Sequence, residues 1–399
     1  MSVSLASQLF APDFFRDPYP VYRRFREEDP VHWAPDFGFW VLTRHADVAG
    51  VMKDPRFTRS LLASASFRRL YDQMPDSPVK ADFESSISQI DPPDHHRLKH
   101  ALLPGFSGTR LERLLEGTRQ WTRTLIEHAR EEREFDLHAW TLDFSARLIA
   151  RLLGIPPQDE STFIRDAAEL LAANRHGASM EDRMRSMQAM VRIEETVAVV
   201  LGRPRIPGVE ALLGDLASVL DSREIQTMVR SLLQAGMEPP SIVLDLAVFT
   251  LYRIPGLVDS LRRSPERIPA ALEEVMRLNH IGRFVQRIAR EDLVLAGRTI
   301  RKGDMVLAGI AAAHRDPTVF PNPDAFELDR STAASFPFGC GPFVCVASGL
   351  VRMHARVVLS ALLEALPLIS FDPGKIRWAP DLFLRKMDEF PVSFRSADR

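Results

Sequence analysis

Apolar side chains recur every three or four residues along several long stretches of this chain, and this period limits the folds open to it. It predicts amphipathic helices at residues 111–132, 183–201, 222–253, 268–278 and 348–366. Shorter strand-like runs, some with turn glycines beside them, occur at 31–33, 39–42, 293–295 and 305–307. The sequence therefore predicts a mainly α fold with a small β region.

Length and composition are those of one large domain. The 399 residues are 45% hydrophobic, enough to bury a large core, and they contain no internal repeat and no low-complexity linker. We therefore expect a single domain over residues 1–399. The 51 Lys and Arg residues nearly balance the 53 Asp and Glu residues without a long run of one sign, so charge does not favour nucleic acid as a partner.

The cysteine content points to a reducing compartment. Cys340 and Cys345 are too few and too close together for a disulfide framework. The first residues lack the basic start and apolar stretch of a signal peptide, and the most apolar later segments carry charged residues such as Asp245 and Glu364. We expect a cytoplasmic protein without a membrane span.

An irregular segment precedes Cys345. The three prolines of residues 316–323 each lack an amide donor, so this stretch cannot be regular structure. Further on, Gly339 and Gly341 permit a tight turn in which backbone amides point at the Cys345 sulfur. Such amides, and the start of the predicted helix that follows, favour a thiolate over a thiol. The alternative is that Cys345 is a small buried packing residue.

Residues 338–352 resemble the haem-ligand signature of the cytochrome P450 superfamily, in its soluble bacterial form: Phe-Gly-x-Gly-x-His-x-Cys-x-Gly-x-x-Leu-Ala-Arg. The matching positions are Phe338, Gly339, Gly341, Cys345, Leu350 and Arg352. The resemblance implies the P450 fold, a triangular helical prism with haem b between a long distal helix and the cysteine-loop helix. It also implies that the Cys345 thiolate binds the haem iron.

Three positions depart from that signature. Phe343 stands where bacterial members usually carry His, Ala347 where Gly is usual, and Val351 where Ala is usual. The resemblance places Phe338, Gly339, Phe343 and Ala347 at the haem. Because Phe343 removes a polar group that faces a haem propionate in the family, it implies altered anchoring of the haem with the ligand itself retained.

Glu274 and Arg277 lie three residues apart in a helical pattern, a spacing that places them on one face. An exposed Glu/Arg pair is common on helices and contributes little to stability. The pair also resembles the Glu-x-x-Arg motif of the P450 family, which implies a scaffold role in contact with the proline-rich loop.

A histidine-rich helix start offers two interpretations. His96 and His100 have the i, i+4 spacing of a helical zinc site, but the sequence shows no partner ligands near them. The segment also resembles the family's Pro-Pro-x-His-x-x-x-Arg helix, which implies that His95 and Lys99 hold haem propionates. Lys99 keeps the charge of the usual Arg without its bidentate geometry. By the same resemblance, Arg287 is a third basic anchor.

Residues 235–240, Ala-Gly-Met-Glu-Pro-Pro, resemble the family's distal Ala-Gly-x-Glu/Asp-Thr-Thr segment. The resemblance implies that Gly236 leaves room for oxygen and substrate and that Glu238 relays protons. Pro239 replaces the usual threonine. The two prolines remove amide donors from a helix interior, at a cost of roughly 3 kcal/mol each unless the helix kinks, and deprive the carbonyls of Ala235 and Gly236 of partners. Alternatively, the prolines only bend a buried helix.

The resemblance also indicates a mainly apolar pocket for a small-molecule substrate. Apolar residues at helical spacing are more often core than pocket, and this alternative stays open for each of them. The pocket residues it implies are Ile90, Leu233, Met237, Phe284 and Phe383.

The chain has no flavin, iron–sulfur or dinucleotide signature. Electrons are therefore expected from a separate ferredoxin and ferredoxin reductase. Basic residues that could receive an acidic partner, or be ordinary surface charge, are Arg110, Arg113, Arg352 and Arg356.

The resemblance implies a haem-thiolate monooxygenase that oxidises a small, largely apolar metabolite with O2, in a secondary-metabolite or hormone-like biosynthetic pathway. One alternative is oxidation without oxygen insertion, such as aryl coupling, ring closure or desaturation. Another is a haem-binding recruitment protein that has lost oxygenase activity, for which the departures at Phe343, Ala347 and Pro239 argue.

Overall fold

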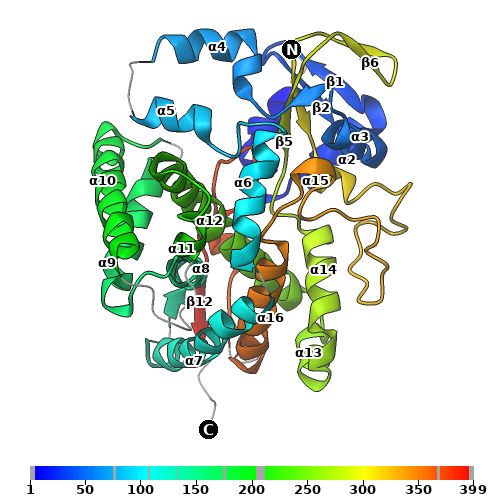
Figure 1. Cartoon of the computed structure of the whole chain (residues 1–399). Coiled ribbons are helices and arrows are strands. Elements are labelled where there is room, and N and C mark those ends of the chain that lie inside the picture. Colours follow the sequence, from blue (N-terminus) through cyan, green and yellow to red (C-terminus); the bar gives the residue numbers. More distant parts are fainter. Residues whose placement is uncertain are drawn as a thin grey trace. The chain divides into compact units, whose positions relative to one another are not determined.

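A computed structural model of the chain describes residues 5–74, 78–106, 108–132, 134–173, 177–203, 212–365 and 369–394 (Figure 1). The chain divides into two compact units. Unit 1 comprises Met1–Asp94, Pro269–Cys345 and Trp378–Lys386. Unit 2 comprises His95–Ile268, Val346–Arg377 and Met387–Arg399. The mainly α composition with small sheets confirms the fold class expected from the sequence.

Unit 1 is built on a five-stranded sheet. Its strand order is β1 (Val31–Ala34), β2 (Phe39–Leu42), β8 (Met305–Ala308), β5 (Val285–Ala289) and β3 (Phe57–Thr58). Only the β2–β8 pair is parallel. A separate hairpin joins β6 (Leu293–Leu295) to β7 (Arg298–Ile300) through Ala296 and Gly297, both at positive φ as a two-residue turn requires. The strands predicted at 31–33, 39–42, 293–295 and 305–307 are confirmed.

Both faces of this sheet are covered, as β2 shows. Phe39 and Val41 point to one face and belong to a core with residues of the N-terminal helices. Trp40 and Leu42 point to the other face and pack with residues of α3. Because side chains alternate along a strand and all four are buried, the strand is a continuous apolar run.

The helices of unit 1 are α1 (Pro12–Arg16), α2 (Tyr19–Glu28), α3 (His45–Lys53), α4 (Ala65–Asp72), α5 (Pro78–Ser85) and α15 (Ile310–Ala313), with α14 (Ile268–Leu278) from Pro269 on.

Unit 2 is largely helical. Its helices are α6 (Asp94–Leu102, from His95 on), α7 (Gly108–Glu132), α8 (Leu137–Leu153), α9 (Pro157–Ala172), α10 (Met180–Gly202), α11 (Leu212–Leu216), α12 (Ser222–Arg253), α13 (Leu257–Arg263) and α16 (Ser348–Ala365). In it α12 packs on α8, α9 on α10, and α7 on α16. A small sheet has the order β4 (Glu134–Asp136), β12 (Pro391–Phe394) and β9 (Ile369–Ser370). Two further short strands are β10 (Arg377–Trp378) and β11 (Met387–Glu389).

The five helices predicted from periodicity are all present, with ends that differ by at most three residues among those described. Local chemistry explains the boundaries of α12, which begins at a capping box. The Asp221 carboxylate accepts from the Glu224 amide at 2.8 Å, and the Glu224 carboxylate accepts from the Asp221 amide at 3.1 Å. A polar contact also ties α12 to α8: buried Asp245 accepts from Thr141 Oγ1 at 2.6 Å and pairs with His138 Nδ1 at 2.7 Å.

Among the described residues, no single helix has the length and apolar character needed to cross a membrane. The helices α12 and α13, bent by 107° at their junction, meet the length and composition criteria only when taken together.

His354 in α16 is a buried titratable group whose ring nitrogens make no hydrogen bond among the described residues. Burial lowers the pKa of His354 from 6.5 to about 4. In the unfolded chain this residue takes up a proton below about pH 6.5, whereas in the folded chain it stays neutral until about pH 4. Above pH 6.5 His354 is neutral in both states and does not change the unfolding free energy. As the pH falls from about 6.5 to about 4, protonation of His354 in the unfolded chain lowers the unfolding free energy.

We predict that His354→Met reduces the acid sensitivity of the fold. Between about pH 7.5 and pH 4.5, the variant should lose about 2–3 kcal/mol less unfolding free energy than the parent. Urea unfolding at a series of pH values measures this difference. The exposed residue His96 supplies the control, because His96→Gln should follow the parent's pH dependence. An equal acid loss in His354→Met and parent would contradict the prediction.

Candidate functional site

The segment before Cys345 is a tight loop in unit 1. Gly339 and Gly341 have φ values of +81° and +77°, the left-handed region that favours glycine. A Cβ on Gly341 would also lie 3.0 Å from the Met52 carbonyl oxygen. The Cys345 amide donates to the Phe338 carbonyl at 3.0 Å, which closes the loop. The glycines and this hydrogen bond fix where the loop presents the Cys345 side chain.

The two cysteines have different surroundings. Cys345 is exposed, which contradicts the alternative that it is a small buried packing residue. Cys340 is half-buried, with its Sγ 3.9 Å from the Ala49 carbonyl oxygen. Burial raises the pKa of the Cys340 thiol, so that group stays protonated at neutral pH. Of the two, Cys345 is the thiol placed to bind a ligand.

Two guanidinium groups lie over the ring of Phe343 in the same loop. The Cζ atoms of Arg59 and Arg287 are 4.8 and 5.2 Å from the ring centroid. Arg287 is only 5% exposed and donates from Nη1 to the Gln286 carbonyl at 2.8 Å. Among the described residues, no carboxylate forms an ion pair with Arg287. Burial and the positive charge of Arg59 lower the pKa of Arg287 to about 10. A carboxylate ligand would fit the buried Arg287 and the half-buried Arg59 beside it.

Asp91, the acid whose charge acts on both arginines, is already engaged. Its carboxylate accepts from Thr58 Oγ1, from the Arg59 backbone amide at 3.4 Å and from Arg290 Nη2 at 2.6 Å. Asp91 therefore orders the segment that carries Arg59, and it leaves Arg287 without an acidic partner of its own among the described residues.

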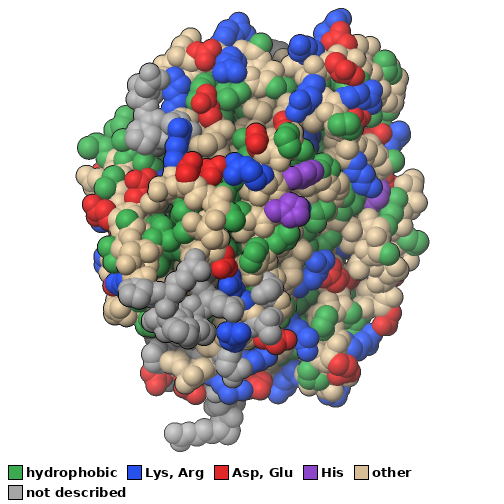
Figure 2. Space-filling model, in the orientation of Figure 1, with side chains coloured by type: hydrophobic (Ala, Val, Ile, Leu, Met, Phe, Trp, Pro, Cys, Tyr) green, Lys and Arg blue, Asp and Glu red, His purple; other side chains and the backbone are tan. Residues whose placement is uncertain are grey.

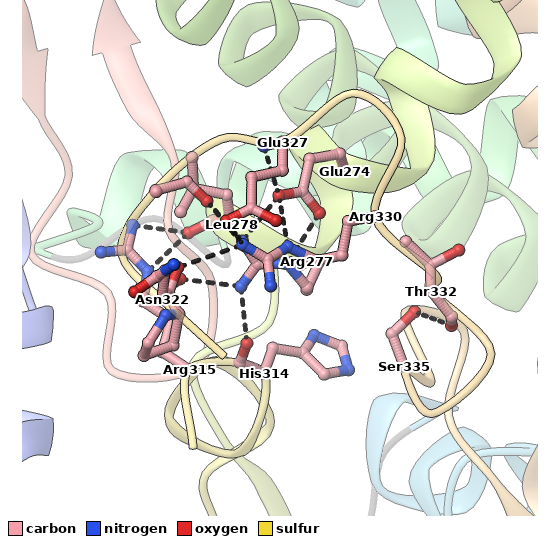
Figure 3. A network of polar contacts seen from close by, with 12 residues as sticks. Glu274, Arg277, Leu278, His314, Arg315, Asn322, Glu327, Arg330, Thr332 and Ser335 are labelled. Carbon is pink, nitrogen blue, oxygen red and sulfur yellow. Dashed lines mark hydrogen bonds and ion pairs between the residues drawn. The ribbon is translucent and has the colours of Figure 1, made fainter. Parts of the chain in front are cut away.

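Glu274 and Arg277 form a buried ion pair at the centre of a polar network (Figure 3). Arg277 donates from Nε and Nη2 to the two carboxylate oxygens of Glu274 at 2.7 and 2.8 Å. The two side chains are 0% and 1% exposed, so the alternative of an ordinary exposed pair is wrong. Arg330 also donates from Nε to Glu274 at 3.0 Å.

The remaining donors of Arg277 hold the proline-rich segment. Nη1 donates to the carbonyls of His314 and Pro323 at 2.9 and 2.8 Å, and Nη2 donates to the Ala325 carbonyl at 3.0 Å. These contacts are drawn in Figure 3. A segment whose prolines rule out regular structure is therefore held by side-chain donors.

Two buried histidines hold the residues just before the cysteine loop. The Phe336 amide donates to His314 Nε2 at 2.9 Å, so that nitrogen carries no proton. Nδ1 of His280 lies 2.9 Å from the Gly282 amide nitrogen and 2.8 Å from the Gly282 carbonyl oxygen, and Nε2 lies 3.1 Å from the Pro337 carbonyl oxygen. Burial lowers the pKa of both imidazoles and keeps them neutral. The sequence analysis missed His280, His314 and Arg59, because their roles depend on contacts between distant segments.

The segment at 235–240 lies in the middle of α12, in unit 2. The helix continues through Pro239 and Pro240. Ala235 is exposed and Glu238 is half-buried, whereas the residues from Pro240 to Leu251 are buried. A Cβ on Gly236 would overlap the side chain of Ile149 in α8. A larger residue at position 236 would therefore force the Ile149 side chain to move, so packing between the two helices favours glycine here whether or not a ligand also does.

The histidine-rich helix is α6. His95 is buried and Lys99 is half-buried, whereas His96 and His100 are exposed. The described residues contain no group of three or more His, Cys, Asp or Glu side chains that could hold a metal ion. The zinc alternative for His96 and His100 thus gains no further ligand from the described structure.

The predicted pocket residues differ in burial. Leu233 and Met237 are each 1% exposed, and Phe284 is a core residue that packs edge-on against Tyr22 with ring centroids 5.7 Å apart. Ile90 is half-buried and Phe383 is exposed. The buried three have the surroundings of ordinary core residues, and a pocket role for any of the five stays a prediction.

Comparison with known proteins identifies the family. The sequence profile of the family described as Cytochrome P450 matches residues 209–377. The chain is 30% identical to Mycinamicin IV hydroxylase/epoxidase of Micromonospora griseorubida, covering 93% of this chain and 94% of the relative. It is 28% identical to Polyketide biosynthesis cytochrome P450 PksS of Bacillus subtilis (strain 168), covering 96% of both. The crystal structure of CalO2 is similar with a TM-score of 0.86 and 28% identity, over 98% of both chains.

The chain belongs to the cytochrome P450 family and has its fold. It is a P450 oxidase, and membership of the family implies a haem cofactor, a small-molecule substrate and a redox partner. The exposed thiol of Cys345 and the buried Arg287 without a carboxylate partner in the described structure fit a haem, which offers an iron to the first and propionates to the second.

We predict that Arg277→Lys destabilises unit 1 strongly, because lysine cannot supply five hydrogen bonds in the planar geometry of arginine and would leave Glu274 poorly paired. The expected loss of unfolding free energy is about 3–5 kcal/mol, measured by urea unfolding. The control is Arg298→Lys at the exposed pair with Asp29, where the loss should stay below about 1 kcal/mol. Similar losses in the two variants would contradict the prediction.

Proposed function

We propose that this chain is a haem-thiolate monooxygenase that binds haem b and oxidises a small, largely apolar metabolite in a biosynthetic pathway of secondary metabolism. The observation that carries the proposal is Cys345, an exposed thiol at the end of a loop fixed by two positive-φ glycines and the hydrogen bond to Phe338. The printed names of two relatives, a mycinamicin hydroxylase/epoxidase and a polyketide-biosynthesis P450, support the biosynthetic setting.

In this proposal the chain's own residues position the cofactor. Cys345 supplies the iron ligand, and Arg287, His95 and Lys99 hold the haem propionates. The loop residues Phe338, Gly339, Phe343 and Ala347 shape the cofactor's surroundings. When bound, the haem supplies the iron at which oxygen is activated. Glu274 and Arg277 act at a distance by fixing the segment that leads to the cysteine loop.

Proton delivery depends on Glu238. Its half-buried carboxylate is the titratable group of the distal segment, since Pro239 removes the usual hydroxyl. Ordered water or a polar group of the substrate would complete the path, and the backbone carbonyls of Ala235 and Gly236, which lack the amide donors of the two prolines, offer acceptors for either. Gly236 lets α12 lie close to α8.

Electrons come from a separate ferredoxin and its reductase. The exposed residues Arg113 and Arg356 remain candidates for docking an acidic partner. Arg110 does not, because it is buried and pairs with Asp215 at 2.7 Å. Among the described residues on the face drawn in Figure 2, Lys, Arg, Asp and Glu side chains are interspersed. Neither Cys340 nor Cys345 forms a disulfide, which is compatible with the cytoplasm as the site of action.

A second candidate reaction is oxidation without oxygen insertion, such as aryl coupling, ring closure or desaturation. Pro239 favours it, because the missing hydroxyl weakens the proton supply that oxygen insertion requires. A pure recruitment role is less well supported, because the positioned thiol of Cys345 and the network around Glu274 would have no purpose in a docking module.

The reduced, carbon-monoxide-bound absorption spectrum tests the proposal. We predict a strongly red-shifted Soret band in the parent, which reports thiolate ligation of the haem iron. Cys345→Ser should abolish that band. The matched control is Cys340→Ser, which should retain it, because Cys340 is half-buried with a raised thiol pKa. Absence of haem from the purified parent would overturn the proposal.

Coupling measurements test the role of Pro239. We predict that Pro239→Thr raises the product formed per electron pair with poor substrates by about two- to fivefold, because it restores a hydroxyl to the distal segment. Pro239→Ala is the control: it restores the amide donor to the Ala235 carbonyl without a hydroxyl and should give a smaller gain. Normal coupling in the parent, with no gain in Pro239→Thr, would show that coupling of electron use to product does not need the hydroxyl.

A further inference from the structure

The ring of Phe343 is shared by two cations that the sheet of unit 1 brings together. Arg59 directly follows β3, and Arg287 lies within β5. The strands pair antiparallel, with Phe57 opposite Ala289 and Thr58 opposite Ile288, so the next step of the register sets Arg59 against Arg287. Both guanidinium groups then reach the same ring, at 4.8 and 5.2 Å from its centroid. The arrangement follows from strand pairing rather than from a chance meeting of surface side chains.

Arg287 is buried and Arg59 is half-buried, and two like charges that share one ring repel each other unless an anion lies near them. Burial, together with the positive charge of Arg59, lowers the pKa of Arg287 to about 10, and burial likewise lowers the pKa of Arg59. Asp91 reduces the repulsion only in part, because Thr58 and Arg290 also bind its carboxylate. The pair therefore fits a further carboxylate that can be shared by two guanidinium groups.

Phe343 suits such a pair better than a histidine would. The face of an aromatic ring carries partial negative charge and attracts cations, and the ring adds no positive charge of its own at any pH. The departure from the family signature at this position thus has a consequence for the cations above it.

We propose that Arg59 is a second guanidinium ligand, beside Arg287, for a haem propionate, and that Phe343 positions both groups. This rests on the proposed haem-thiolate function. In it, Arg59 supplies the polar contact that the family's histidine would make, from the segment after β3 instead of from the cysteine loop. The alternative is that Arg59 only supports the segment around Asp91, through its backbone amide.

The rate of haem loss to excess apomyoglobin separates these two roles without measuring turnover. Arg59→Gln should speed haem loss about 10- to 100-fold, the range expected when one charged hydrogen bond is removed, and Arg287→Gln should do the same. Arg290→Gln is the matched control, because it removes another guanidinium from Asp91 without touching the Phe343 ring, and it should stay within about twofold of the parent. Parent-like haem loss in Arg59→Gln would overturn the proposal.

Two exchanges at Phe343 test the platform. Phe343→Leu keeps an apolar side chain but removes the aromatic face, and it should speed haem loss about three- to tenfold. Phe343→Tyr keeps the ring and should behave like the parent. If Leu and Tyr variants lose haem equally fast, the ring does not position the two guanidinium groups.

Haem dimethyl ester, which lacks free carboxylates, provides a second measurement. After reconstitution of the apoproteins with this ester, the difference between parent and Arg59→Gln should shrink to about twofold or less, because no carboxylate remains for Arg59 to bind. A difference that persists would mean that Arg59 acts through the fold. The carbon-monoxide spectrum distinguishes this outcome from failure of the proposed function. Arg59→Gln should retain the thiolate-type band, whereas the parent itself would lack that band if the proposed function were wrong.

Discussion

The buried pair of Glu274 and Arg277 is the interaction on which the cysteine side of the structure depends. A guanidinium buried without partners would be prohibitively unfavourable, and here each donor has an acceptor: the Glu274 carboxylate and three backbone carbonyls. Those carbonyls belong to a segment that its prolines keep out of regular structure. The pair therefore supplies the hydrogen bonds that regular structure would otherwise give this segment. His314 extends the network by accepting a hydrogen bond from the Phe336 amide.

The elements were predictable where local patterns decide them, and the site only in part. Periodicity located the helix at 222–253 because burial in its first half follows the helical repeat, and the second half is a continuous buried run. Motif positions such as Cys345, Glu274 and Arg277 were also found, since their residue types and spacing are local features. Arg59 carries no such mark. Its place beside Arg287 comes from pairing of β3 with β5, which joins segments more than two hundred residues apart, and no local pattern encodes that contact.

Gly236 shows a different limit. The sequence offered room for oxygen and substrate as the reason for a glycine, and the structure adds another reason, because a side chain there would overlap Ile149. Both explanations can hold for Gly236. The contacts within unit 2 give evidence for the packing explanation alone. A substitution at Gly236 would thus disturb helix packing before it reported on chemistry.

The same contact has a mechanical consequence for the two prolines. α12 is held against α8 at Gly236 and again at Asp245, where His138 and Thr141 bind the carboxylate. Pro239 and Pro240 lie between these two points of contact with α8. A free helix could relax around missing amide donors by hinging, but a span fixed at both ends resists that motion. Pro239 and Pro240 offer no amide donor to the carbonyls of Ala235 and Gly236, and the two contacts with α8 keep this stretch of the helix in place.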